Sequence, residues 1–361
     1  MKAAVLRAPG GLDRIEVHDI PDPGQPGPGQ IRIALHATSL NYHDLLVANG
    51  GLPTADGRVL MSDGAGVVEA VGDGVAEFRP GDHVVSCFFP QWQDGLPRGP
   101  VGDLAGTPGD GIDGFAAHFS VRAATDFTHA PRGWSHAEAA TITTAGVTAW
   151  RALVGDGQIK AGDTVLVLGT GGVSIAALQI AKMTGAAVIA TSSSDEKLER
   201  VRALGADHVI NYRQVPDWGK RVRDLTGGGV DHVVEVGGPG TLAQSIEVVR
   251  VGGHISLVGV LTGLQSEVST VALLAKQAPA RTHGRQQAPA AGLCRCARTV
   301  GGTPRPGQHL PPRSDGRRIQ LPGQWRPFRQ GRRRMVNLSS TNWRPAKYSE
   351  ELSSDMPRIT P

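Results

Sequence analysis

The sequence predicts an α/β chain with two folded domains and an irregular basic C-terminal segment. Three observations carry this prediction. Short apolar runs alternate with Pro and Gly clusters over the first 125 residues, strand-like and helix-like segments alternate from about 130 to 260, and arginine, proline and glycine dominate the end. A chain of 361 residues is long enough for two domains. The expected boundaries are 1–125, 126–278 and 279–361.

The first domain is expected to be an all-β barrel with long loops. Its strand-like segments are 2–6, 31–36, 67–71, 83–86 and 115–121. Clusters of proline and glycine at 21–29, 50–53 and 97–114 separate them. Short strands interrupted by turn residues in this way are typical of barrels rather than of parallel sheets.

A glycine loop opens the second domain, where residues 164–182 read TVLVLGTGGVSIAALQIAK. The apolar run 165–168 predicts a strand buried on both faces of a parallel sheet. Gly169, Gly171 and Gly172 allow a tight turn whose backbone N–H groups approach a pyrophosphate closely, with Ser174 at the third small position. The helix from Val173 directs its partial positive charge at the same place. This predicts a dinucleotide site; the alternative is a glycine turn in an α/β protein that binds no nucleotide.

The residues after the loop continue the alternation. Strands are expected at 186–191, 208–212, 230–236 and 254–260, and helices at 196–204, 217–225 and 241–249. Such βαβ alternation predicts a doubly wound parallel sheet with right-handed crossovers. Ligands of these sheets bind beyond the carboxyl ends of the strands, where the glycine loop lies.

The end of the second strand favours NADPH over NADH. Proteins that select NADH usually place an acid there for the ribose 2′-hydroxyl. This chain has Thr-Ser-Ser-Ser at 191–194, no acid before Asp195, and Lys197 close by, which suits a 2′-phosphate. Ser193 and Glu196 are also spaced as a helix capping box, and both readings can hold. NADH stays possible.

Several motifs in one order resemble the medium-chain dehydrogenase/reductase superfamily. They are N-x-x-D at Asn41 and Asp44, GAGVVEAVG at 64–72, and F-x-P-G-D-x-V at 78–84, followed by the glycine loop. The chain is similar to the zinc-lacking, quinone oxidoreductase-like and alcohol dehydrogenase-like branch over about residues 1–278. The resemblance implies a GroES-like barrel, a Rossmann domain, and NADPH-dependent hydride transfer to a quinone, an enone or another carbonyl.

The residues also indicate that no zinc is bound. Zinc-using relatives carry cysteine at the position of Asn41 and Gly-His-Glu at 61–63, which read Met-Ser-Asp here. Serine and asparagine are poor zinc ligands beside thiolate and imidazole. Cys87 is the only cysteine before Cys294, so the four-cysteine structural lobe of some relatives cannot form.

The resemblance assigns site residues position by position. Asn41, Tyr42 and Asp63 are the expected catalytic residues, with the Asn41 amide donating a hydrogen bond to a developing enolate. His43 lies beside them and could also move a proton, but a structural or solvent-facing role is expected for it. The residues expected to bind the cofactor are Asn41, Thr148, Gly169, Gly171, Gly172, Val173, Ser192, Ser193, Lys197, Tyr212, Gly237, Val258, Gly259 and Val260.

The C-terminal segment differs from the body in charge. Residues 1–278 carry a net charge of −8 and residues 279–361 one of +12, so the net charge of +4 averages two unlike pieces. Three explanations stay open: a frameshifted reading of GC-rich codons, a disordered basic arm, or an ordered but divergent end. The segment has no aromatic stripe and no nucleic-acid-binding motif, so no specific nucleic acid is expected. The family implies a homodimer, which a segment without apolar periodicity supports poorly.

Other classes are disfavoured. No apolar stretch reaches 18 residues, and the first ten residues read as a strand rather than a signal peptide, so a cytoplasmic protein without membrane partners is expected. The hydrolase motifs G-x-S-x-G and H-E-x-x-H do not occur. The partner should be a small-molecule substrate. The alternative function is an NADPH-binding sensor, or an inactive homologue with a damaged C-terminus.

Overall fold

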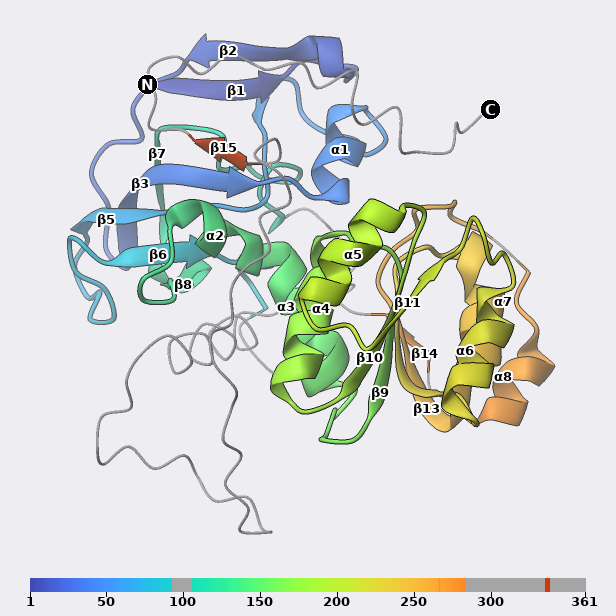
Figure 1. Ribbon diagram of the computed structural model, residues 1–361. Helices are drawn as coiled ribbons and strands as arrows, with labels where there is room; N and C mark the ends of the chain where they lie inside the picture. The colour runs from blue at the N-terminus through green and yellow to red at the C-terminus, as the bar shows by residue number, and fades with distance from the viewer. Residues whose placement is uncertain (93–105, 266, 279, 283–334, 338–361) are drawn as a thin grey trace, which may run out of the picture. The chain divides into compact units, whose positions relative to one another are not determined.

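The computed structural model describes residues 1–92, 106–265, 267–278, 280–282 and 335–337. The chain forms two compact units, whose main segments are Met1–Val147 and Thr148–His283 (Figure 1). The domain boundaries expected at 125 and 278 stay predictions.

The first unit is built mainly of antiparallel strands. A three-stranded sheet has the order β2-β1-β4, and a larger sheet has the order β15-β3-β5-β6-β8, with β7 also paired to β3. The strands are β1 (Lys2–Leu6), β2 (Ile15–Asp19), β3 (Gln30–Ser39), β4 (Arg58–Val59), β5 (Ala65–Val71), β6 (His83–Ser86), β7 (Phe119–Ala123), β8 (Phe127–His129) and β15 (Met335–Asn337). The helical segments are η1 (Leu12–Arg14), α1 (Tyr42–Ala48), η3 (Ala124–Asp126), α2 (His136–Thr141) and the π-helical turn η4 (Ile142–Gly146).

The strands expected to dominate the first domain are present, but the expectation of an all-β domain is wrong at α1, and one strand is displaced. The strand expected at 115–121 begins only at Phe119, because the preceding residues turn into the core. The Phe115 side chain is 1% exposed and packs edge-to-face on Phe127, with ring centroids 5.9 Å apart. An aromatic pair of this geometry stabilises the barrel core beyond its buried area.

The second unit is a six-stranded parallel sheet with the order β11-β10-β9-β12-β13-β14. Its strands are β9 (Thr164–Val167), β10 (Ala187–Ser192), β11 (His208–Asn211), β12 (Val230–Glu235), β13 (Val249–Leu257) and β14 (Ala280–Thr282). Its helical segments are α3 (Val147–Trp150), the π-helical turn η5 (Arg151–Gly155), α4 (Gly172–Met183), α5 (Asp195–Ala203), α6 (Trp218–Thr226), α7 (Pro239–Val248) and α8 (Thr270–Lys276).

The strand order reverses between β9 and β12, which confirms the expected doubly wound topology. Helices α4 and α5 cover one face of the sheet, and α6 and α7 cover the other (Figure 1). The central strand β9 is buried on both faces, since Val165, Leu166 and Val167 are at most 1% exposed. Ligand sites in such sheets lie at the carboxyl ends of the strands where the order reverses. In this chain that point lies after β9 and β12.

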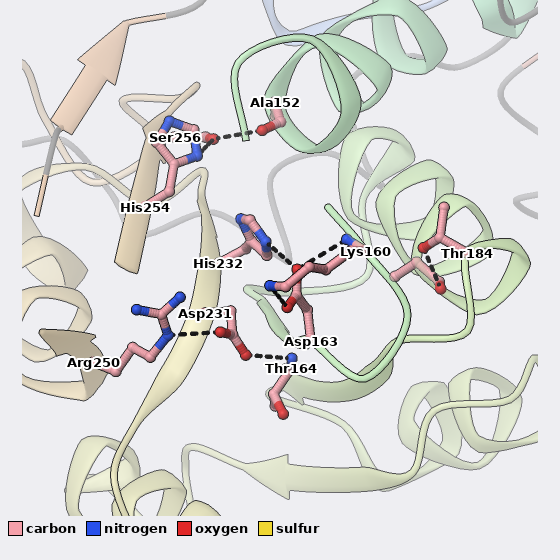
Figure 2. A network of polar contacts seen from close by, with 11 residues as sticks. Ala152, Lys160, Asp163, Thr164, Thr184, Asp231, His232, Arg250, His254 and Ser256 are labelled. Carbon is pink, nitrogen blue, oxygen red and sulfur yellow. Dashed lines mark hydrogen bonds and ion pairs between the residues drawn. The ribbon is translucent and has the colours of Figure 1, made fainter. Parts of the chain in front are cut away.

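The opposite end of the sheet is closed by polar side chains (Figure 2). Asp231 accepts a hydrogen bond from the backbone of Thr164 at 2.8 Å and one from Arg250 at 2.6 Å. Asp163 accepts from the backbone of Lys160 at 2.9 Å and lies 3.1 Å from Nε2 of the buried His232. These contacts join the first residues of β9, β12 and β13. The amino end of the sheet is therefore structural, and the carboxyl end is left for ligand binding.

Two strands lie in the segment expected to be an irregular tail. Ala280–Thr282 pairs with β13, and Met335–Asn337 pairs with β3, so the expectation of irregular structure is wrong for these six residues. The rest of 279–361 lies outside the described residues. No helix in the described ranges is long and apolar enough to cross a membrane.

Candidate functional site

The glycine loop after β9 has the geometry that a dinucleotide requires. Gly169 has a φ of 69°, a conformation that favours glycine, and its N–H donates to Thr191 Oγ1 at 3.3 Å. A Cβ built on Gly169 or Gly171 would meet no described atom within 4 Å, so the outer side of the loop is open. Ser174 is 1% exposed and donates to the carbonyl of Leu168 at 2.6 Å, which holds the helix close to the strand.

Helix α4 begins at this loop and runs for 12 residues. Its N-cap is Gly171, which has no side chain to satisfy the first amides, so the N–H groups of Gly172 and Val173 remain for an anion. Loop and helix therefore fit the pyrophosphate of a dinucleotide.

The residues expected around an adenosine phosphate gather at the ends of β10 and β11. Ser192 is buried at 3% exposure, and its carbonyl accepts from the N–H of Tyr212 at 3.0 Å. Ser194 caps α5, accepting from the N–H of Lys197 at 3.4 Å. The capping box read at Ser193 and Glu196 is therefore wrong, because the helix begins at Asp195, its cap is Ser194, and the residue three positions after the cap is Lys197.

The acid nearest this place is engaged elsewhere. Asp195 accepts from Asn211 Nδ2 at 2.7 Å and from Gln214 Nε2 at 2.9 Å. Both carboxylate oxygens of Asp195 therefore accept hydrogen bonds from side chains at or just after the end of β11. Ser193 is half-buried and does not serve as the helix cap.

The ends of β12 and β13 are held by a residue that the sequence analysis missed. Glu235 is completely buried and accepts from the N–H groups of Gly237 at 2.8 Å and Gly238 at 3.0 Å, and from Thr241 Oγ1 at 2.5 Å. Its backbone carbonyl accepts from Val258 at 2.8 Å. An acid that ends an apolar strand just before two glycines is the sequence signal that could have revealed it.

The remaining residues predicted to bind the cofactor are placed relative to Glu235 or lie in α3. Gly259 also donates its N–H to the carbonyl of Glu235, at 3.2 Å, which places it and Val260 beside Gly237. Thr148 lies in α3 with its side chain 1% exposed. Its assignment as a cofactor contact stays a prediction.

In the first unit, Asn41 lies among carboxylates. Its Nδ2 donates to Asp63 Oδ2 at 2.9 Å and to Asp44 Oδ2 at 3.2 Å, and its backbone N–H donates to Asp44 at 2.8 Å. Burial raises the pKa of Asp44, although hydrogen bonds from Asn41 and Ser62 oppose the rise. Both amide hydrogens of Asn41 have acceptors nearby, so donation to a substrate, as expected from the sequence, would have to break one of these bonds.

The loop carrying Asp63 begins at a strained residue. Met61 has a φ of 79°, although a side chain makes this conformation costly by about 1–2 kcal/mol. Zinc-using relatives have the glycine of Gly-His-Glu at this position. The chain thus keeps a glycine-like backbone while the following residues, Ser62 and Asp63, differ from the relatives' ligands.

Tyr42 and His43 are the first two residues of α1. Tyr42 is half-buried, and His43 Nε2 lies 3.7 Å from Asp110 Oδ2. The His43 ring packs edge-on against Phe88, with centroids 5.2 Å apart. Asp110 is 5% exposed, and burial raises its pKa. The role expected for His43 stays a prediction.

The donor set in this region does not fit a catalytic zinc ion. Asp63 is completely buried; its Oδ1 accepts from Thr144 Oγ1 at 2.6 Å and its Oδ2 accepts from Asn41. Its neighbours Asn41 and Ser62 supply neither a thiolate nor an imidazole. Across the described residues, no group of three or more His, Cys, Asp or Glu side chains is placed to hold a metal ion.

Comparisons with known proteins agree with the fold in both halves. The alcohol dehydrogenase GroES-like domain model matches residues 27–132, and the zinc-binding dehydrogenase model matches residues 172–283. The second match covers the cofactor region and none of the residues at the zinc position. A zinc-type alcohol dehydrogenase-like protein of Schizosaccharomyces pombe is 44% identical over 256 residues, which are 69% of this chain and 73% of that protein.

Solved structures give the same result. A protein of Sinorhizobium meliloti 1021, provisionally named an alcohol dehydrogenase, superposes with a TM-score of 0.78 at 41% identity, over 84% of this chain and 89% of its own. An NAD-dependent alcohol dehydrogenase superposes with a TM-score of 0.73 at 36% identity, over 83% and 89% of the two chains. A mycobacterial protein in complex with NADPH has a TM-score of 0.69 at 28% identity, over 83% and 88%.

The two domains expected from the resemblance, a GroES-like domain followed by a Rossmann domain, are thereby confirmed. One of these structures is named as NAD-dependent and another contains NADPH, and the glycine loop after β9 fits such a cofactor. This chain belongs to the medium-chain dehydrogenase/reductase superfamily of NAD(P)-dependent oxidoreductases.

Proposed function

We propose that this protein is an NADPH-dependent, zinc-independent oxidoreductase that transfers a hydride to a quinone, an enone or another carbonyl. The observation that carries the proposal is the hydrogen bonding of Asp63. Its two oxygens accept from Thr144 and Asn41 at the place where zinc-using relatives bind their metal. A conjugated substrate suits such a site, because conjugation stabilises the charge that a metal ion would otherwise stabilise.

The preference for NADPH rests on the end of β10. Ser192, Ser193 and Lys197 offer hydroxyls and a cation, and Asp195 is held by Asn211 and Gln214. A 2′-phosphate is an acceptor that hydroxyl and ammonium donors satisfy, whereas an acid here would repel it. The relative crystallised with NADPH supports this choice, and the NAD-dependent relative makes NADH the competing cofactor.

When bound, the nicotinamide supplies the hydride from its C4 atom. The protein supplies binding and orientation: the amides of Gly172 and Val173 bind the pyrophosphate, and Gly237 and Gly259 flank the nicotinamide at the ends of β12 and β13. Tyr42 is the proposed proton donor to the reduced substrate. Asn41 orients the nicotinamide end.

A matched pair of substrates tests the proposal. The purified full chain should oxidise NADPH with 1,4-benzoquinone and with 2-cyclohexenone faster than with cyclohexanone, which has the same ring without conjugation. Addition of 1,10-phenanthroline should leave the rates unchanged. Loss of activity with the chelator would contradict zinc independence, and NADPH binding without turnover of any substrate would favour a sensor.

Lys197→Ala tests the choice of cofactor. It should weaken NADPH binding by about 1–3 kcal/mol, the contribution of a charged hydrogen bond, and leave NADH binding unchanged. Lys220→Ala, an exposed lysine on α6, is the control and should affect neither cofactor. Equal losses for both cofactors on Lys197→Ala, measured by calorimetric titration, would show that Lys197 is structural.

A further inference from the structure

Three histidine side chains of the first unit are stacked on one another. His36 lies on β3, His83 is the first residue of β6, and His136 is the first residue of α2. The His136 ring stacks on His36 with centroids 4.6 Å apart, and on His83 with centroids 4.8 Å apart. His83 Nδ1 and His136 Nε2 lie 2.9 Å apart, within hydrogen-bond distance. His136 therefore connects α2 to two strands of the larger sheet.

The stack lies between this helix and the outer face of the sheet. Leu35 and Val84, which adjoin two of the histidines in sequence, belong to the apolar core of the first unit. Successive side chains of a strand point to opposite faces, so His36 and His83 face away from that core. Helix α2 packs against β3, β5 and β6 on this side (Figure 1). His36 and His136 are half-buried and His83 is exposed, so protons from the solvent reach the stack.

The contact between His83 and His136 requires that one of the two rings is neutral. A neutral imidazole has one donor and one acceptor nitrogen, whereas both nitrogens of a protonated imidazole are donors. When both rings are protonated, the pair has no acceptor and two cations lie in contact. Burial, followed by the charges of His36 and His83, lowers the pKa of His136 to about 4. An unfolded histidine has a pKa near 6.5, so the folded stack opposes a proton that the unfolded chain accepts.

The carboxylates on the elements around the stack have other partners. Glu138 on α2 accepts from the backbone and the hydroxyl of Ser135, at 2.9 and 2.8 Å. Glu69 on β5 accepts from Arg32 at 2.9 Å, and Asp82, just before β6, accepts from a backbone N–H of its own turn at 3.0 Å. The residues of β15 and η4 include no titratable side chain. Within the described ranges, no carboxylate is hydrogen-bonded to the three rings to neutralise added charge.

The flanking strands place their titratable side chains on the other face. Arg122 of β7 pairs with Ile31, and His129 of β8 pairs with Val84. Ile31 and Val84 both belong to the apolar core, and directly paired residues point to the same face of a sheet. Positive charge on the stack is therefore opposed mainly by the stacked rings themselves.

We propose that the stack of His36, His136 and His83 is an acid-sensitive clasp, which holds α2 on the sheet at neutral pH and releases it when His136 takes up a proton. The turn η4 begins where α2 ends, and its Thr144 donates to Asp63. Release of α2 therefore also loosens the polar residues around Asp63. This inference goes beyond the proposed function and does not depend on a cofactor.

Hydrogen exchange of the amides at 139–146, in the full chain between pH 7 and pH 4, tests the clasp. After correction for intrinsic rates, the opening constant in wild type should rise about tenfold per pH unit below about pH 6.5, because opening takes up one proton. His136→Gln keeps an acceptor for His83 and cannot be protonated, so its opening constant should change by less than about twofold per pH unit. The control is His118→Gln, at an exposed position of the same unit outside the stack, and it should follow wild type.

Two outcomes would overturn the inference. The opening constants of wild type and His136→Gln could rise in parallel as the pH falls, which would assign the acid sensitivity to other groups. Alternatively, His136→Gln could lose at pH 7 the protection that wild type loses at pH 5, which would make His136 a packing residue. If His136→Gln does not fold, His83→Gln supplies the test, because its side-chain oxygen can accept from a protonated His136. The rise should then be smaller than in wild type, and an unchanged rise would refute the clasp.

Discussion

Asp163 is a buried carboxylate, and its neighbours at the amino end of the sheet stabilise its charged form. Burial alone would raise its pKa, but hydrogen bonds from the side chain and backbone of Lys160 and from His232 outweigh this, and the pKa is lowered. A carboxyl group with a lowered pKa stabilises the folded state above its unfolded pKa, near 3.9. This contribution is lost as the pH falls through the folded pKa.

The variant Asp163→Asn should therefore be less stable than wild type at pH 7, by about 1.5–3 kcal/mol, because charged hydrogen bonds to a buried group are lost. Its stability should also fall less steeply below pH 4. Urea unfolding at pH 7 and at several values below pH 4 measures both effects. Asp224→Asn, at an exposed position on α6, is the control and should behave as wild type. A parallel pH dependence in wild type and Asp163→Asn would show that other groups cause the acid sensitivity.

At the scale of elements, the start of α5 separates capping from ligand binding. Ser194 accepts from the N–H of Lys197, whereas the adjacent Ser193 does not cap the helix. Ser194→Ala should lower the free energy of unfolding by about 1 kcal/mol, the usual cost of losing a serine cap. Ser193→Ala should change stability by less than about 0.5 kcal/mol and should weaken NADPH binding. Thermal melts and cofactor titrations of both variants measure this; the reverse assignment of the two losses would contradict it.

The elements found from sequence are those with a strong local pattern. The apolar run of β9 and the alternation that follows it predict the parallel sheet, and each of its strands up to β13 overlaps the expected range. The strand β2 and the helix α1 were missed because they are short, and the exposed face of β2 shows little apolar character. The π-helical turns were missed because no single-sequence pattern distinguishes them from an α-helix.

At the scale of the whole molecule, the candidate site also contains residues that could be named from a local sequence pattern and residues that could not. The glycine loop is one local motif, so its residues could be named from sequence. The bond between Thr144 and Asp63 joins residues 81 positions apart, and Glu235 acts on a turn that other side chains also shape. Contacts between distant segments depend on the packed structure, and composition and periodicity give no access to them.

Thermal melting of the full-length chain tests whether the chain folds cooperatively and binds a nicotinamide cofactor. A ligand at 100 times its dissociation constant adds about 2.7 kcal/mol to the free energy of unfolding, which raises the melting temperature visibly. NADPH should raise it more than NADH at equal concentration, because the end of β10 offers donors to a 2′-phosphate. Lys197→Ala should remove the difference between the cofactors while keeping the shift that NADH produces.

A cooperative transition that neither cofactor moves would contradict the cofactor site at the glycine loop. Absence of a cooperative transition would show that the basic C-terminal segment prevents this chain from forming the stable fold of its relatives.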